Sequence, residues 1–268
     1  MVEETLTLVK LGGSLITDKS RPFTERKEVI DRLAREIHSA RERSGIRIIL
    51  GHGGGSYPHR PAKKYRTADG MVNEDSARGI AEVQDAAARL NRTVVRSLID
   101  AGEDAVSMQP SASCISERGK VKEWYTAPIE MLLEKGMLPV VYGDVSLDTR
   151  KGCCILSTEE LFDYLTMKMQ AARVIMVGKV EGVMTGDPSR DRDAEIVKKI
   201  TPQNFRYVRK HLQGSDATDV TGGMVHKVEK ALKLAEAGAE VHIISGMAPG
   251  RLEKALLGQK VTGTVIRA

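Results

Sequence analysis

The stretch GHGGGSYPH, residues 51–59, decides the fold of this chain. It follows the apolar run Ile46 to Leu50, whose length and composition predict a short buried strand. Three consecutive glycines after a strand let the backbone take positive φ angles and approach a bound group closely. Successive N–H groups in such a turn form a concavity that binds anions, and a following helix adds its positive N-terminal end. We therefore predict a phosphate-binding loop, with His59 placed to donate a hydrogen bond to a phosphate oxygen.

A second loop of the same kind opens the chain, where KLGGS at residues 10–14 follows the strand-like run Leu6 to Val9. Between the two loops, residues 25–43 carry apolar side chains at helical spacing, which predicts an amphipathic helix. Strand, helix and strand in this order form a βαβ unit with a parallel sheet and a right-handed crossover. Two glycine loops, one with a lysine and one with a histidine, suggest two phosphates facing each other. This is the geometry of a small-molecule kinase.

Strands and helices alternate through the rest of the chain, without an internal repeat or a low-complexity linker. Expected helices span 73–101, 128–135, 157–172, 201–211, 225–237 and 249–257, and expected strands span 105–108, 137–142, 173–177, 241–244 and 261–266. Segment 114–124 is predicted as a hairpin or an irregular insertion, and segment 145–156 as another hairpin. The pattern predicts the α/β class, as a three-layer αβα sandwich with a mainly parallel central sheet in a single domain over 1–268.

Two helix starts carry capping signals. Asn73 is predicted as the N-cap of the long helix, with Glu74 and Asp75 in its first turn. The run STEE at residues 157–160 has the pattern of a capping box, in which Ser157 or Thr158 is the N-cap.

The composition excludes several classes of protein. The chain has 268 residues, 41% hydrophobic and 29% charged, with a net charge of +5, and no Lys/Arg block interleaved with aromatic residues, so we expect no nucleic-acid partner. No apolar run approaches the roughly 20 residues that span a bilayer, so we expect no membrane segment. The three cysteines are odd in number and lack metal-ligand spacing, and the N-terminus has no signal-peptide pattern. Both features favour a cytoplasmic protein.

Three lysines lie in or just after glycine-rich turns: Lys10, Lys19 and Lys227. Phosphoryl transfer needs donor and acceptor phosphates held in line, and positive charge where oxygens gain charge in the transition state. The chain has neither a GxxxxGK[ST] P-loop nor the catalytic-loop pattern of protein kinases. The three lysines are therefore predicted to serve a different kind of kinase.

The order of the motifs resembles the amino acid kinase superfamily over essentially the whole chain. The matching motifs are KLGGS at 10–14, HGGGS at 52–56, YGD at 142–144, TGDP at 185–188 and DVTGGM at 219–224. Within that superfamily, Lys19, His59 and Lys227 look like isopentenyl phosphate kinase. That family uses Mg-ATP to phosphorylate isopentenyl phosphate to isopentenyl diphosphate, chiefly in archaeal isoprenoid synthesis through an alternate mevalonate pathway. The resemblance also implies a homodimer.

The resemblance implies specific roles for individual residues. Residues of about 1–170 would form the acceptor-binding half and residues of about 171–268 the nucleotide-binding half. Lys19 would bridge donor and acceptor, and with Lys10, His59 and Lys227 it makes up the expected catalytic set. The expected ATP-binding residues are Lys10, Gly12, Gly13, Ser14, Gly55, Asp187, Gly223 and Lys227. The expected acceptor-binding residues are Gly54, through its backbone N–H, His59, Gly143 and Thr158. No residue is assigned to a metal site, and Mg²⁺ is expected with ATP.

The chain departs from the family pattern in three places. Tyr57-Pro58 replaces the usual Phe-Gly before the histidine, and proline removes a backbone donor and fixes φ. Thr158 stands where a glycine is common, in a Ser-Gly-Asp-Asp run. Lys179 adds a positive charge where an aspartate is usual.

Other functions stay open on the sequence. Fosfomycin kinases share the fold and a histidine beside the glycine loop, but their acceptor is a small phosphonate. The apolar stripe of the 73–101 helix leans toward an isoprenoid tail. A nucleotide-binding regulatory protein without turnover is a third reading, and the intact set of lysines and His59 argues against it.

Overall fold

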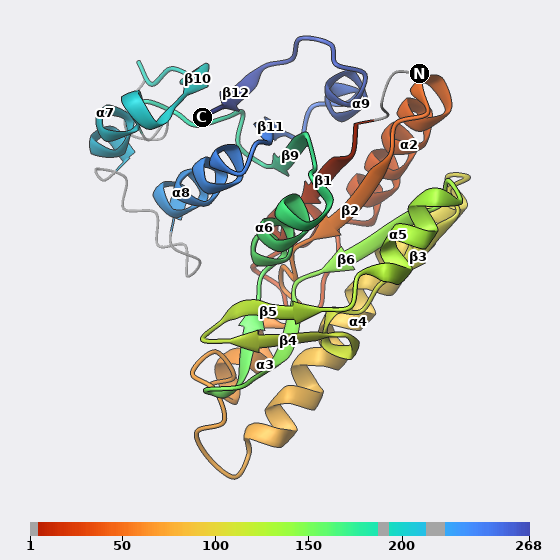
Figure 1. The fold of residues 1–268 in the computed structure, drawn as a ribbon, viewed down its shortest axis with the longest axis vertical. Coiled ribbons are helices and arrows are strands. Elements are labelled where there is room, and N and C mark those ends of the chain that lie inside the picture. The colour runs from red at the N-terminus through yellow and green to blue at the C-terminus, as the bar shows by residue number, and fades with distance from the viewer. Residues whose placement is uncertain (1–4, 187–192, 213–222) are drawn as a thin grey trace.

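A large, mainly parallel β-sheet forms the centre of the molecule (Figure 1). The computed structural model describes residues 5–186, 193–212 and 223–268. Within that part of the chain, neighbouring strands pair in parallel except for β11 and β12, which are antiparallel. The strands in their order across the sheet are β10 (Lys199–Ile200), β12 (Gly263–Ile266), β11 (Glu240–Ser245), β9 (Arg173–Gly178), β1 (Thr7–Leu11), β2 (Ile48–His52), β6 (Leu138–Tyr142) and β3 (Ala105–Ser107).

Helices cover both faces of this sheet. One face packs against α5 (Ala127–Glu134), α6 (Thr158–Met169), α7 (Pro202–Leu212) and α8 (Gly223–Glu236). The other face packs against α1 (Gly13–Ile16), α2 (Lys27–Ser44), α4 (Ser76–Asp100) and α9 (Arg251–Leu256). The predicted three-layer αβα sandwich with a mainly parallel sheet is therefore confirmed.

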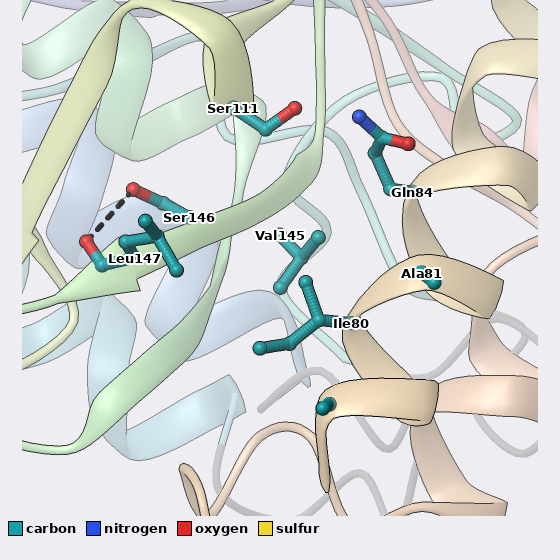
Figure 2. A pocket seen from close by; sticks show the side chains of 8 residues that line it. Ile80, Ala81, Gln84, Ser111, Val145, Ser146 and Leu147 are labelled. Carbon is teal, nitrogen blue, oxygen red and sulfur yellow. Dashed lines mark hydrogen bonds between the residues drawn. The ribbon is translucent and has the colours of Figure 1, made fainter.

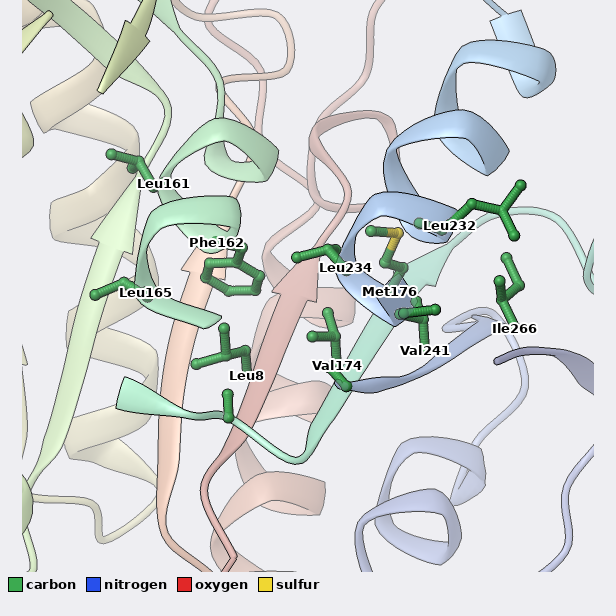
Figure 3. Close-up of a cluster of buried hydrophobic side chains, with 14 of the residues drawn as sticks. Leu8, Leu161, Phe162, Leu165, Val174, Met176, Leu232, Leu234, Val241 and Ile266 are labelled. Carbon is green, nitrogen blue, oxygen red and sulfur yellow. The ribbon is translucent and has the colours of Figure 1, made fainter. Parts of the chain in front are cut away.

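The apolar strand residues divide between two hydrophobic cores according to the strand period of two. In β1, Leu8 belongs to the core under α6 and α8, whereas Val9 belongs to the core under α2 and α4. Figure 3 shows side chains of α6 and α8, among them Phe162 and Leu234, above strand side chains such as Val174. Because this core includes residues from both sides of position 170, it joins the two halves that the sequence predicted.

A separate four-stranded sheet extends from the end of the sandwich. Its order is β5 (Lys120–Trp124), β4 (Cys114–Glu117), β7 (Asp144–Asp148) and β8 (Gly152–Leu156). The two predicted hairpins are confirmed as β4–β5 and β7–β8, and β4 pairs in parallel with β7 to join them. A short 3₁₀ helix, η1 (Pro110–Ala112), leads into this sheet, and a short helix, α3 (His59–Lys64), follows the glycine loop.

Of the two predicted helix caps, the one at Ser157 is confirmed and the one at Asn73 is not. Ser157 is the N-cap of α6, and its hydroxyl accepts a hydrogen bond from the Glu160 N–H, as predicted. The prediction for Asn73 was wrong, because α4 begins at Ser76 and has no acidic residue in its first turn. The Ser76 hydroxyl instead accepts N–H groups from Val72 and Asn73, which holds the preceding loop in a turn.

The carboxylate of Asp148 holds the far end of the four-stranded sheet together. It accepts the N–H groups of Arg150 (2.9 Å) and Lys151 (3.0 Å) in the β7–β8 turn, and that of Gly119 (2.7 Å) in the β4–β5 turn. Burial alone raises the pKa of a carboxyl group, but these N–H donors outweigh it and lower the pKa of Asp148 to about 2. Two hairpin turns therefore depend on one ionised side chain.

We expect Asp148→Asn to destabilise the protein by about 2 kcal/mol at pH 7. Because the folded-state pKa is depressed, the charge stabilises the native state above pH 4 or so, and this contribution is lost as the pH falls toward 2. Urea unfolding at pH 7 and pH 3 measures the effect, and the difference between parent and variant should narrow at pH 3. The exposed carboxylate Glu134, changed to Gln, is the control. If the parent and Asp148→Asn differed in unfolding free energy by the same amount at both pH values, the charge of Asp148 would not be what stabilises the turns.

No helix in the described part of the chain has the length and apolar character needed to cross a membrane.

Candidate active site

The two glycine loops meet at one edge of the central sheet. Strands β1 and β2 are parallel neighbours with Leu11 opposite His52, so their carboxyl ends deliver both loops to the same place. A Cβ atom added to Gly13 would lie 2.4 Å from the Gly55 nitrogen, and one added to Gly53 would lie 2.9 Å from the Gly13 nitrogen. The two backbones touch without side chains between them. This contact leaves the N–H groups of both loops in one small volume.

A single hydroxyl group ties the two loops together. Thr17, just after α1, donates to the Gly13 carbonyl oxygen at 2.7 Å and accepts the Ser56 N–H at 2.9 Å. Gly55 takes the left-handed conformation (φ +57°) beside it, and any side chain there would meet Thr17. The sequence reasoning did not single out Thr17. A threonine three residues after GGS was the available signal.

Lys10, near the end of β1, forms a half-buried ion pair with Glu159 of α6. Burial alone raises the pKa of a carboxyl group, but the Lys10 ammonium outweighs it and lowers the pKa of Glu159 to about 2. Glu159 is therefore ionised through the physiological range. The sequence reasoning placed Glu159 in a capping box and did not assign it to Lys10, which lies 149 positions away.

The same end of α6 also contacts α8. Glu160 pairs with Lys230 at 2.7 Å, one turn after the predicted nucleotide-binding residue Lys227. Gly223 begins α8 in the left-handed conformation (φ +66°). Burial raises the pKa of the nearby Asp163 to about 6, and Glu160 acts in the same direction. Neighbouring carboxylates of α6 thus pair with Lys10 of β1 and with Lys230 of α8.

His59 is the first residue of α3 and is exposed next to the second glycine loop. Pro58 takes helical dihedral angles (φ −80°, ψ −16°) as the N-cap of α3, so the ring fits the turn that leads to His59. A Cβ added to Gly54 would lie 2.2 Å from the Pro58 ring, which shows that the ring packs directly on Gly54. The departure from the usual Phe-Gly therefore leaves His59 beside the loop.

Tyr57 connects the glycine loop to the segment that carries Lys19. Its hydroxyl donates to the carboxylate of Glu25, and its ring packs edge-on against Phe23 with 5.6 Å between centroids. Burial, then the bond to Glu25, raises the pKa of Tyr57 to about 12, so the phenol stays protonated. Lys19 is exposed in a turn that these contacts hold beside residues 54–57.

The remaining predicted acceptor residues lie where β2 ends. The His52 carbonyl oxygen accepts the Gly143 N–H at 3.0 Å and the Thr158 hydroxyl at 2.7 Å. The Thr158 side chain is thus buried and engaged with the backbone, and its predicted contact with substrate stays a prediction. Lys179 is exposed at the end of β9. Asp187 lies outside the described residues.

An apolar cavity of about 290 Å³ lies between α4 and β7. Figure 2 shows Ile80 of α4 and Val145 of β7 facing each other across it, with the polar side chains of Ser111 and Gln84 nearby. Ile80 and Val145 also pack in a small cluster with Ala62 of α3, three residues beyond His59. One wall of the cavity is therefore continuous with an apolar cluster that includes a residue of α3, the helix that begins at His59.

No group of three or more His, Cys, Asp or Glu in the described ranges is arranged to hold a metal ion. The charged groups at the site are instead the lysines and the carboxylates of α6 that pair with them.

The profile of the amino acid kinase family matches residues 5–245 of the chain. The chain belongs to the amino acid kinase family. It is 38% identical to an isopentenyl phosphate kinase of Methanothermobacter thermautotrophicus, over 97% of this chain and 98% of that one. It is 27% identical to an isopentenyl phosphate kinase of Arabidopsis thaliana, over 82% of this chain and 73% of the plant protein.

The fold agrees with this family assignment. A solved structure of isopentenyl phosphate kinase superposes with a TM-score of 0.82 at 35% identity, covering 97% of this chain and all of that one. The predicted membership among the isopentenyl phosphate kinases is thereby confirmed. Because similar proteins occur in both an archaeon and a plant, the source of the chain does not follow from them.

Proposed function

We propose that this protein is a kinase that transfers the γ-phosphoryl group of ATP to isopentenyl phosphate and releases isopentenyl diphosphate. The observation that carries the proposal is the meeting of two bare glycine loops beside Lys10 and His59 at one sheet edge. Backbone N–H groups at such an edge bind phosphate, and the histidine supplies a further donor, which the family resemblance associates with a phosphate acceptor rather than a carboxylate. The relatives at 38% and 27% identity carry this activity in their names.

ATP and Mg²⁺ fit the residues that are present. The glycines let the two loop backbones touch without side chains, so backbone N–H groups of both loops can reach phosphate oxygens. When bound, ATP would supply the phosphoryl group and Mg²⁺ would offset the charge on its oxygens. The residues proposed to hold the nucleotide are Lys10, Gly12, Gly13, Ser14, Gly55, Gly223 and Lys227, with Asp187 assigned on the family resemblance alone.

The proposed catalysis is positioning and charge stabilisation, with no covalent intermediate on the protein. The ion pair with Glu159 holds Lys10 at the site, so its positive charge is positioned before phosphate arrives. Lys19, on the segment fastened to the glycine loop through Tyr57, would bridge the two phosphates. His59 and the Gly54 N–H would bind the acceptor phosphate. Holding the two phosphates in line in this way is the main source of rate enhancement for such transfers.

The apolar cavity supports an acceptor with a hydrocarbon tail. Ile80, Val145 and Leu147 line it, and Ile80 and Val145 belong to the same apolar cluster as Ala62 of α3. A five-carbon chain has a volume of the order of 100 Å³, which such a space accommodates. A small polar phosphonate such as fosfomycin would leave those apolar walls without contacts. We therefore assign isopentenyl phosphate ahead of fosfomycin.

ADP release with Mg-ATP tests the proposal, with isopentenyl phosphate, fosfomycin and no acceptor in parallel. We expect turnover with isopentenyl phosphate and only background release in the other two arms. Turnover with fosfomycin alone would reassign the acceptor. ATP binding without turnover in any arm would refute the kinase assignment.

We also propose a division of labour within the single domain, with residues of about 1–170 binding the acceptor and residues of about 171–268 the nucleotide. A cytoplasmic homodimer is proposed on the family resemblance. The three free buried thiols suit a reducing compartment. Sedimentation equilibrium measures the oligomeric state.

A further inference from the structure

Three polar side chains form a row behind the second glycine loop. The Ser107 hydroxyl lies 2.6 Å from the Asn91 carbonyl oxygen, and the Asn91 amide nitrogen lies 3.1 Å from His52 Nε2. At the other side of the ring, His52 Nδ1 lies 3.2 Å from the Gly53 carbonyl oxygen. His52 and Asn91 are each only 1% exposed. The row therefore runs from β3 through α4 to the loop itself.

The acceptor at the end of the row fixes the direction of every hydrogen bond in it. The Gly53 carbonyl oxygen can only accept, so His52 Nδ1 must carry a proton. Burial lowers the pKa of His52 to about 4, although the bond to Gly53 acts in the opposite direction, so the ring is neutral at pH 7. A neutral ring protonated at Nδ1 has a bare Nε2, which accepts from the Asn91 amide. Ser107 then donates to the Asn91 carbonyl oxygen, and every bond points toward Gly53.

The ring itself is held in one place. It stacks on Tyr142 of β6, with 5.6 Å between ring centroids and 10° between the planes. The backbone carbonyl of His52 is fixed separately by Gly143 and Thr158. These contacts hold the ring and the end of the strand in place, so a rotation of the Gly53–Gly54 peptide would break the hydrogen bond from His52.

Fixing the Gly53 carbonyl also fixes the next N–H group. A trans peptide is planar, with its N–H directed opposite to its C=O, so the Gly54 N–H points away from His52. Glycine residues have little steric preference between backbone conformations, so a run of three could rotate this peptide at small cost. The bond from His52 opposes that rotation.

We propose that Ser107, Asn91 and His52 form a positioning relay that keeps the Gly54 N–H directed at the acceptor phosphate. The relay touches neither substrate, and it acts through the Gly53–Gly54 peptide. The inference rests on the proposed function, in which Gly54 binds the phosphate of isopentenyl phosphate. It adds the residues that set the direction of that contact, and it makes the relay specific to the acceptor rather than to ATP.

Nitrogen-15 NMR of the imidazoles in the parent protein tests the direction of the relay without any substrate. We expect a neutral His52 ring at pH 7 with the proton on Nδ1. A ring protonated at Nε2 alone would leave the Gly53 carbonyl without a donor and would overturn the relay.

Steady-state kinetics with isopentenyl phosphate test its effect on the acceptor. His52→Leu keeps similar bulk without a donor, whereas His52→Asn places an amide N–H near the position of Nδ1. We expect His52→Leu to raise the KM for isopentenyl phosphate at least tenfold, with the KM for ATP within twofold of the parent. We expect His52→Asn to recover most of the loss.

Ser107→Ala removes only the far end of the relay and keeps the test open should His52→Leu fail to fold. We expect it to raise the acceptor KM about threefold. The matched control is Ser39→Ala on α2. It removes a half-buried hydroxyl that donates to the Glu253 carboxylate of α9 at 2.8 Å. That change should alter neither KM.

The outcomes separate the relay from the function on which it rests. A parent protein without turnover on isopentenyl phosphate refutes the proposed function and the acceptor role of the relay together. An active parent whose His52 and Ser107 variants lose thermal stability but keep the acceptor KM refutes the relay alone, because the row would then only satisfy buried polar groups.

Discussion

Gly13→Ala is expected to lower kcat/KM for both substrates by about 100-fold or more. The added methyl group would lie 2.4 Å from the Gly55 nitrogen and 2.7 Å from the Gly55 Cα, and neither backbone atom can yield without moving its loop. Separation of the loops by about 1 Å misaligns donor and acceptor, and misplacement on this scale costs on the order of 100-fold in rate. Steady-state assays with each substrate varied in turn measure the loss.

Gly178→Ala is the matched control for this change. Gly178 ends β9 at the same edge of the sheet, but its added methyl group would meet no atom closer than 3.9 Å. It should retain activity within about threefold. Gly53→Ala, where the approach is 2.9 Å, provides a second variant and should give a smaller loss than Gly13→Ala. Full activity in a folded Gly13→Ala protein would contradict the close contact between the loops.

His59→Ala is expected to reduce use of the phosphorylated acceptor by about 10- to 100-fold while leaving the KM for ATP nearly unchanged. A hydrogen bond to a charged oxygen contributes roughly 1.5–3 kcal/mol, which corresponds to that range. His59 is the first residue of α3, directly after the glycine loop, and in the proposed function it binds the acceptor phosphate, so its loss should not affect the nucleotide. Measurement of kcat and both KM values separates the two effects.

The neighbouring cation on the same helix distinguishes a specific hydrogen bond from general attraction. Arg60→Ala removes a full positive charge from an exposed position one residue away. We expect less than a threefold change in that variant at physiological ionic strength, because exposed charges are screened. Equal losses in the two variants would indicate an electrostatic field rather than a bond from His59, and unchanged acceptor kinetics in His59→Ala would remove its assigned role.

The predictable part of this fold lies in local patterns. The glycine loops follow strands, the 25–43 helix pattern became α2, and the βαβ unit is parallel, as expected from residues close together in the sequence. The predicted start of the long helix was wrong, because the Ser76 hydroxyl forms the hydrogen bonds that end the preceding loop, a role predicted for Asn73.

The contacts that the sequence did not predict join distant segments. Glu159 meets Lys10 across 149 positions, and Asn91 meets His52 across 39. The four-stranded sheet depends on parallel pairing of Ile115 with Leu147, which neither hairpin reveals by itself. Periodicity and spacing report which residues share a face of one element, and they do not report which element that face will meet. The family resemblance supplied substrate and cofactor, and the roles of the individual site residues stay predictions.

The central place of β1 has a consequence for how the protein is made. This strand leaves the ribosome well before β9, yet it lies between β2 and β9, with Lys10 opposite both Gly51 and Met176. At translation rates of about 5–20 residues per second, one edge of β1 waits roughly 10–30 seconds for its second neighbour. Until then the nascent chain exposes an unpaired parallel edge rich in leucine and valine, which is the kind of surface that chaperones cover. The strand that carries Lys10 thus gains its second neighbour only from a segment far along the chain.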